Sequence, residues 1–475
     1  MSKSIKILLF TLGGLVGLLV LIATAVLLFV DANAFKPRLE TAASNALGME
    51  VKVDGRMGIR FAPGLFVTLK DVHIRNRGSD VVSAEGARLG IDLLPLLQKD
   101  VRIETISLQH PRISIERDRG GQFNFERLKA AVKTLPAQDL SRVSLAEGTF
   151  LYADQQSGEK FEARDCDLEV RHLQFSGWRS KDLMRNLSFT AELACGEIRK
   201  KDFTVSGLKV SAAGEKGVFD LQPVTMQIFG AQGTGSIHAD FSGEVPRYSV
   251  HYALPQFHIE EFFKSLSPQK VAAGTMDFTA QLSLQGTTLK TMRQSLAGRI
   301  SLRGGNLTLR GRDLDQELSR YESSQHFNLV DVGAFFFAGP LGLVVTKGYN
   351  FAGLLQGSEG SSEIRTLVSD WTVENGVARA QDVAMATKEH RVALKGGLDF
   401  VNQRFDDVTV ALIDAKGCAK VRQRILGSFQ KPVVEKPSLL STLTGPAMKL
   451  LKKGMALFPG GECDVFYAGS VPPPE

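Results

Sequence analysis

Apolar and polar residues alternate with a period of two along most of the chain that follows residue 49. Val51 and Val53 alternate with Lys52 and Asp54, and similar runs recur as far as Asp407–Ile413. Such alternation is typical of a β-strand that buries one face and exposes the other. The runs predict a long antiparallel meander of about 20 strands. The parity of the alternation shifts near Asp71, which predicts a β-bulge there.

A sheet of that length cannot stay flat, because strands twist and large open sheets curl. Its apolar face therefore has to be covered by helices, by the curled sheet itself or by a ligand. The predicted fold class is mainly β: an elongated, curled antiparallel sheet that forms a groove. A few short helices accompany this sheet, and one N-terminal transmembrane helix precedes it.

Short helical patterns interrupt the strands. The segment Ala34–Leu47 has an apolar stripe, with Pro37 in its first turn and Gly48 at its C-terminal cap. Four further short helices are predicted, in Glu126–Thr134, Ile259–Leu266, Leu289–Leu296 and Arg312–Glu322.

The N-terminal segment from Ile5 to Val30 is almost continuously apolar. A helix of about 20 apolar residues spans the hydrocarbon core of a bilayer, so the segment predicts a membrane anchor. Lys3 and Lys6 lie at its start, and the positive-inside tendency keeps that end in the cytoplasm and exports the rest. A cleaved signal peptide is the alternative, although its apolar core is usually only about 7–15 residues long. The anchor residues are Ile5, Leu9, Leu15, Leu19, Leu27 and Val30.

Two other segments are candidates for contact with lipid. The insert 328–345 is rich in apolar residues around a Gly-Pro break, and it is either a buried hairpin or an element that touches lipid. The tail segment Gly445–Phe458 predicts an amphipathic helix with lysines on its polar face, which either lies on a membrane or caps the end of the sheet. The candidate lipid-contacting residues are Phe335, Phe336, Phe337, Leu341, Met448, Leu451, Met455 and Phe458.

Four cysteines in an exported protein are able to pair. Cys418 and Cys463 would close the C-terminal segment, and Cys166 and Cys195 lie in two runs that could be neighbouring strands. Unpaired buried thiols are the alternative. The net charge of +6 is mild and spread along the chain, so it does not call for a nucleic-acid partner.

Motifs of catalysis and metal binding are absent from the sequence. There is no H-E-x-x-H, G-x-S-x-G, Walker or C-x-x-C pattern, and no two of the eight histidines have the spacing of a helical metal site. We therefore predict no catalytic residue, no metal and no cofactor. Asp313 and Asp382 are expected to accept hydrogen bonds from turn amides.

Four motifs occur in a recognisable order behind the anchor. They are FKPRLETAASNALGMEVKVDGRMGIRFAPGLFVTLKDVHIRN, ISLQHPRISIERDRGGQFNFERL, LQGTTLKTMRQSLAGRISLRGGNLTLRGRDLDQEL and VENGVARAQDVAMATKEHRVALKGGLDF. In this order the chain resembles the AsmA-like proteins of Gram-negative bacteria over almost its whole length. The stretch from about Tyr152 to Pro268 matches least.

The resemblance implies a bridge-like lipid-transfer fold, anchored in the inner membrane and projecting into the periplasm. It implies a non-enzymatic protein that holds the acyl chains of phospholipid in an apolar β-groove, for transport between envelope membranes. The alternative is a scaffold or assembly factor for outer-membrane biogenesis with envelope protein partners.

We expect five segments along the chain. They are a cytoplasmic stub and anchor (1–34), an N-terminal AsmA-like helix and first strands (35–135), a central β-meander (136–285), a C-terminal AsmA-like β region containing the insert (286–416) and a disulfide-closed tail (417–475).

Overall fold

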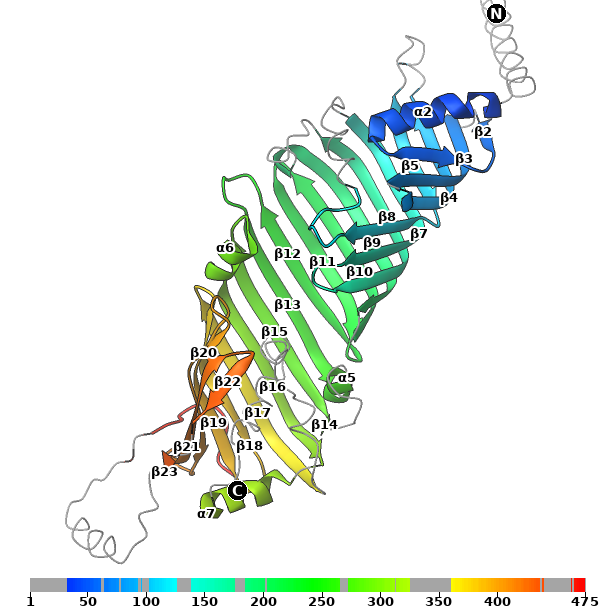
Figure 1. Ribbon diagram of the computed structural model, residues 1–475. Helices are drawn as coiled ribbons and strands as arrows, with labels where there is room; N and C mark the ends of the chain where they lie inside the picture. Colours follow the sequence, from blue (N-terminus) through cyan, green and yellow to red (C-terminus); the bar gives the residue numbers. More distant parts are fainter. Residues whose placement is uncertain are drawn as a thin grey trace, which may run out of the picture. The chain divides into compact units, whose positions relative to one another are not determined.

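The computed structural model covers the 475 residues of the chain. It describes residues 32–60, 64–76, 78–92, 95, 102–125, 138–175, 184–200, 203–264, 272–311, 313–324, 360–435, 438–439, 463 and 465–474. Contacts divide the chain into two compact units, Met1–Gln222 and Pro223–Glu475 (Figure 1). Strand β11 (Val218–Ile228) contains the boundary between them. The division of the chain into five segments stays a prediction.

Strands make up most of the described residues of the first unit. Its elements are η1 (Ala32–Phe35), α2 (Lys36–Leu47), β1 (Glu50–Val53), β2 (Met57–Arg60), β3 (Leu65–Asn76), β4 (Ser79–Ile91), β5 (Ile103–Gln109), β6 (Arg112–Arg117), β7 (Gln138–Asp154), β8 (Lys160–Phe175), η2 (Met184–Asn186), β9 (Leu187–Lys200) and β10 (Phe203–Glu215).

The prediction of a purely antiparallel sheet is wrong at one place in this unit. Strands β5 and β6 both pair with β7 in parallel, whereas the other pairings of the unit are antiparallel, so the sheet is mixed. His110 and Pro111 separate β5 from β6, because proline has no N–H to give to a ladder. The two short strands lie end to end and together occupy one strand position next to β7.

Helix α2 closes the edge of the sheet at β1–β3 (Figure 1). Its start and end agree with the sequence pattern: Pro37 lies in its first turn and Gly48 caps it with a left-handed φ of 63°. The carboxylate of Glu40 accepts a hydrogen bond of 2.8 Å from the backbone N–H of Val53, and the hydroxyl of Ser44 accepts one of 2.8 Å from Val51. The helix thus satisfies N–H groups of β1 that would otherwise be open to pairing with another strand.

The second unit contains the remaining strands and three short α-helices among its described residues. Its elements are β12 (Ala231–Asp240), β13 (Arg247–His258), α5 (Ile259–Lys264), β14 (Ala272–Ala273), β15 (Thr275–Gln285), α6 (Leu289–Gln294), β16 (Ala297–Arg310), α7 (Leu314–Ser324), β17 (Ser361–Glu374), β18 (Val377–Ala386), β19 (Arg391–Asp399), β20 (Arg404–Ile413), β21 (Ala419–Ser428), β22 (Lys431–Val434) and β23 (Ser438–Leu439).

Both faces of strands β17–β20 are buried in this unit. One face joins a large core with Phe262 and Phe263 of α5 and with Leu314 and Leu318 of α7. The opposite face is lined with alanines and is covered by Phe466, Tyr467 and Val471 of the C-terminal segment. The part of the unit around β17–β20 therefore fills its own apolar interior, as a sandwich does.

The predicted helices that fall on described residues are confirmed as α2, α5, α6 and α7. Across the described part of the chain, no helix combines the length and apolar character that a membrane crossing requires. The predicted anchor from Ile5 to Val30, the helix Glu126–Thr134, the insert 328–345 and the tail helix Gly445–Phe458 lie outside the described residues.

Candidate functional site

The inner face of the first unit consists of apolar residues that stand directly opposite one another on successive strands. Residues in register on neighbouring strands point to the same face, so each chain of partners is a row that crosses the sheet. The first row is Val51, Ile74, Val82, Ile113, Phe150, Ala163, Ile198 and Val205. The second is Met57, Leu69, Ala87, Leu108, Leu145, Leu168, Leu193 and Val210. The third is Ile59, Val67, Leu89, Ile106, Val143, Val170, Ala191 and Ala212.

The opposite face of the same strands is polar. Its corresponding row is Gly58, Thr68, Arg88, Ser107, Ser144, Glu169, Glu192 and Ser211. Arg171 and Arg142 pair with Glu169 at 2.8 and 2.6 Å. The hydrogen bond from Arg171 is the main cause that holds the pKa of Glu169 below its usual value. Ion pairs of this kind are typical of a sheet face that is exposed to water. The candidate site is therefore the other face, which carries the apolar rows.

A line of three small residues and one leucine divides the apolar face. Gly148, Cys166, Cys195 and Leu208 are partners in register, and the ring of Pro111 lies beside Gly148. Nearby, Asp71, His110, Glu147, Asp165 and Gly207 have positive φ angles. Strands β3, β4 and β7–β10 shift their parity at or beside this line, and at the strand position shared by β5 and β6 the shift falls between the two strands. The bulge predicted near Asp71 is therefore confirmed, and it is one of a series that creases the sheet.

The disulfides predicted from the sequence are both present. Cys166 pairs with Cys195 on the floor of the crease, and Cys418 pairs with Cys463 in the second unit. Phe150, Leu193, Ile198 and Leu208 pack around the first disulfide. The disulfide thus fastens β8 to β9 where the walls of the crease meet.

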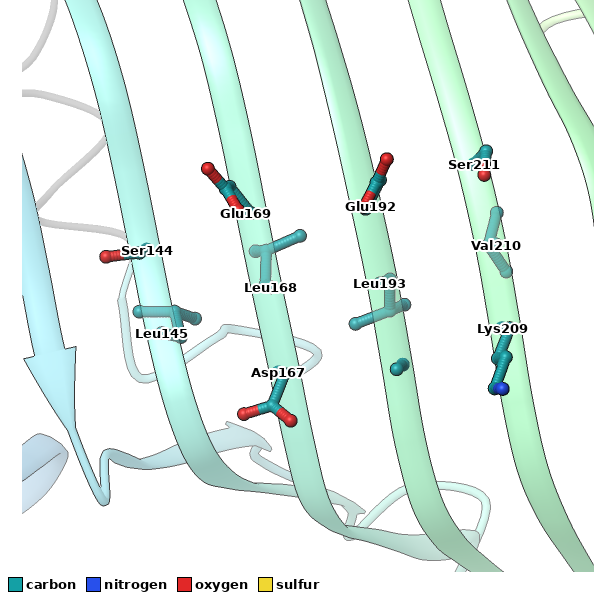
Figure 2. Close-up of a pocket in the computed structure, with 11 residues that line it drawn as sticks. Ser144, Leu145, Asp167, Leu168, Glu169, Glu192, Leu193, Lys209, Val210 and Ser211 are labelled. Atoms are coloured by element: carbon teal, nitrogen blue, oxygen red, sulfur yellow. The ribbon is translucent and has the colours of Figure 1, made fainter.

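Over β7–β10 the apolar side chains on either side of the crease are half-buried. Val143, Leu168, Val170 and Val210 belong neither to the cluster beneath α2 nor to the one around the disulfide. On the opposite face of the same four strands lies a hollow of about 420 Å³, whose lining is mostly polar and includes Asp167, Glu169, Glu192 and Lys209 (Figure 2). In the second unit, by contrast, Leu367, Val373 and Leu398 are completely buried. Among the described residues, the first unit therefore presents an extended apolar face, and half-buried apolar residues in register also occur in the second unit at Ile237, Val250 and Leu282.

The residues predicted to touch lipid in the insert and the tail lie outside the described residues, so their role stays a prediction. One group of metal-ligand type occurs in the described part of the chain, formed by Asp54, Asp71 and His73. His73 contacts the carboxylates of Asp71 and Asp80 at 3.1 Å each, and Asp80 also pairs with Arg75. We assign this exposed network to the polar face, where it links β3 and β4.

The two aspartates expected to satisfy turn amides behave differently. Asp313 accepts a hydrogen bond from the backbone N–H of Gln316 at the start of α7, as expected. Asp382 instead accepts hydrogen bonds from Tyr467 and Ser470 of the C-terminal segment. Asp382 thus does accept from a backbone amide, the N–H of Ser470 at 3.0 Å, but this amide lies 88 residues away and not in a local turn.

The fold and the face together define a predominantly β protein whose amphipathic sheet keeps an apolar side partly uncovered in its first unit. The model of the AsmA family matches residues 1–190 and 178–337. These matches cover more than half of the chain, which therefore belongs to the AsmA family. Among curated proteins, the comparison found no match to the chain. Membership of this family is consistent with lipid transport in the envelope or with outer-membrane assembly.

Proposed function

We propose that the first unit holds the acyl chains of phospholipid on its apolar face, as part of phospholipid transport between envelope membranes. One observation carries the proposal: three rows in register cross the strands of the unit without a polar or charged side chain, and over β7–β10 they are largely half-buried. A sheet face that is apolar and not filled by its own protein needs an apolar partner.

The energetics suit a weak and continuous binding surface. Each methylene that leaves water contributes about 0.8 kcal/mol, and no charged side chain interrupts the rows. Eight strands about 4.8 Å apart give each row a length of about 34 Å. That is about twice the depth of one leaflet's hydrocarbon, which is half of about 30 Å. The apolar face is therefore wider across the strands than one acyl chain is long.

The proposal includes a location and partners. The segment Ile5–Val30 anchors the chain in the inner membrane with the N-terminus in the cytoplasm and the body in the periplasm. The partners are membrane lipid and envelope proteins. The positions of Lys3 and Lys6 support this orientation.

Photo-crosslinking tests the proposal at two adjacent positions. Leu168 belongs to an apolar row and Glu169 to the polar row, so a benzophenone amino acid at each samples opposite faces of one strand. In the full chain, purified from cells in mild detergent, position 168 should capture phospholipid and position 169 should not. Equal capture at both positions, or none at either, would remove the basis for lipid binding.

A scaffold for outer-membrane assembly is the second candidate. The filled interior around β17–β20 favours it, because side chains of the same unit occupy that interior and leave only the outer surface for partners. The hydrogen bonds of α2 with β1 argue against partner binding by strand addition at that edge. In the crosslinking experiment, a scaffold would give protein adducts at polar-face positions and no lipid adduct at Leu168.

A further inference from the structure

The apolar face of the first unit changes its chemistry at one end of the strands. Along β7 the inward residues run from Val143 and Leu145 through Phe150 to Tyr152 and finally Asp154. On β9, which runs in the same chain direction as β7, the inward residues run from Leu193 through Ile198 to Lys200 at the same rim. Aliphatic residues thus give way to aromatic ones and then to charged ones, which is the order of environments from the interior of a lipid leaflet to water.

The transition occurs in one register row. Its members are Ile115, Tyr152, Phe161, Lys200 and Phe203, which stand opposite one another on β6–β10. The rings of Tyr152 and Phe161 stack with their centroids 5.4 Å apart. Phe161 is 41% exposed, one of the few large apolar side chains of the described first unit that are exposed. We call this row the aromatic rim.

Beyond the aromatic rim the face becomes ionic. Arg117 and Asp154 are partners in register and approach to 3.4 Å. The opposite ends of the same strands differ, because Leu140, Leu173 and Phe189 continue the apolar face there. Among the described residues of β7–β9, the polar boundary of the face therefore lies at one end.

Lys200 is the cation within the aromatic rim. Its ammonium group lies 2.8 Å from the carboxylate of Glu159, and its side chain is 43% exposed. An ammonium has three N–H donors, so a single carboxylate does not use up its capacity. The aliphatic part of its side chain lies on the apolar face between Phe161 and Phe203, so its positive charge lies at the border of that face.

Resting on the proposed function, we infer that a glycerophospholipid lies parallel to the strands, with its phosphate at Lys200 and its acyl chains over the aliphatic rows. Half of a bilayer, headgroups included, is about 20–22 Å deep. Seven residues of strand, at about 3.3 Å each, bring the chain ends from Lys200 to the level of Leu193. The lipid would cross the rows and the crease instead of lying along one row.

Two photoreactive forms of phosphatidylglycerol test the orientation on the full chain in detergent. A diazirine in the headgroup should label peptides around Phe161 and Phe203, and a diazirine at the chain end should label peptides around Leu168 and Leu193. If both probes label the same row on different strands, the lipid lies across the strands, so the inferred orientation is wrong while lipid binding stands. If neither probe labels the face, the proposed function itself fails.

Charge variants test the phosphate contact. Lys200→Gln should lower the preference for phosphatidylglycerol over diacylglycerol about fivefold, as the loss of one partly exposed charge-assisted hydrogen bond would. Lys200→Arg should keep the preference. Lys160→Gln is the matched control, because Lys160 is at the same strand end but its alternation places it on the polar face. Equal effects of Lys200→Gln and Lys160→Gln would overturn the assignment.

A free phosphate ion and a lipid headgroup share the same chemistry, so a separate measurement distinguishes them. Lys200 should be protected from chemical acetylation by vesicles of phosphatidylglycerol and not by inorganic phosphate alone. Protection by inorganic phosphate to the same extent would make the site an anion site independent of lipid, and would overturn the inference.

Discussion

The hydroxyl of Tyr467 donates a hydrogen bond of 2.5 Å to the carboxylate of Asp382, which lies 85 residues earlier in the chain. The N–H of Val471 donates to the same hydroxyl at 3.0 Å, and Arg391 donates to the carbonyl of Val471 at 2.9 Å. These bonds fasten the C-terminal segment over the alanine-lined face of β17–β20. The segment thus completes the second side of the second unit.

We predict that Tyr467→Phe destabilises the second unit by about 1–2 kcal/mol, because a half-buried hydrogen bond is lost and Val471 and Asp382 each lose a partner. Hydrogen exchange of the amides in 465–471 should report the loss as faster exchange. Tyr152→Phe, in the first unit, is the control and should leave these amides unchanged. Unaltered exchange in Tyr467→Phe would show that packing alone holds the segment.

The attachment of the C-terminal segment should weaken in acid. Burial acts to raise the pKa of Asp382, but hydrogen bonds from Ser470 and Tyr467 outweigh it and hold the pKa below its usual value. A lowered pKa in the folded state gives stability that is fully present above the ordinary aspartate value of about 3.9. That stability is lost as the pH falls through the folded pKa. An acid titration of the Phe466 and Tyr467 amide signals should show it, and Asp382→Asn should remove this part of the pH dependence.

The β1 edge of the first unit should promote self-association when α2 loses the side chains that accept hydrogen bonds from β1. Glu40→Ala together with Ser44→Ala leaves the N–H groups of Val53 and Val51 without these partners. Open strand edges pair with other chains, so we expect self-association of the double variant. Sedimentation velocity measures it, with Thr41→Ala on the same helix as the control. A monodisperse double variant would mean that water satisfies the N–H groups of Val51 and Val53 and that the open edge does not cause association.

The two disulfides should differ in their rate of reduction. Cys166 and Cys195 are 0% and 5% exposed on the crease floor, whereas Cys463 is exposed. Exchange requires that a thiolate reaches a sulfur atom, so Cys418–Cys463 should open first in dilute dithiothreitol under native conditions. Alkylation followed by mass spectrometry gives the order. Equal rates would indicate that β8 and β9 separate as readily as the tail does.

The positions of most strands and helices follow from local sequence pattern. Which side chains share a face of the sheet does not. Alternation predicts the strands, and Pro37 and Gly48 bound α2 correctly, because these signals act within a few residues. The bulge at Asp71 is visible because Leu69 and Val72 are three residues apart. Elsewhere a parity shift looks like an ordinary change of strand, so the crease and its rows emerge only from register.

The candidate site illustrates the same limit. In the sequence, Lys200 belongs to a run of charged residues typical of a turn, and only its pairing with Phe161 and Phe203 places it on the apolar face. Likewise, nothing local links Asp382 to Tyr467. The parallel pairing of β6 with β7 is also invisible, since alternation does not encode strand direction.

The proposed lipid face makes a prediction that separates function from stability. Leu168 is half-buried on an apolar row of the first unit, and Leu367 is completely buried in the core of the second. Leu367→Ala should cost about 2–5 kcal/mol, because it leaves a cavity in packed surroundings. Leu168→Ala should cost only about 1 kcal/mol, because its side chain is already partly in water. Urea denaturation, with hydrogen exchange to assign each unit, measures both.

Lipid that co-purifies with the protein should fall for Leu168→Asn and stay unchanged for Leu367→Ala, provided the latter still folds. A face that binds lipid should lose binding, but little stability, when one of its residues is substituted. If Leu367→Ala loses lipid while Leu168→Asn keeps it, the apolar rows serve stability alone.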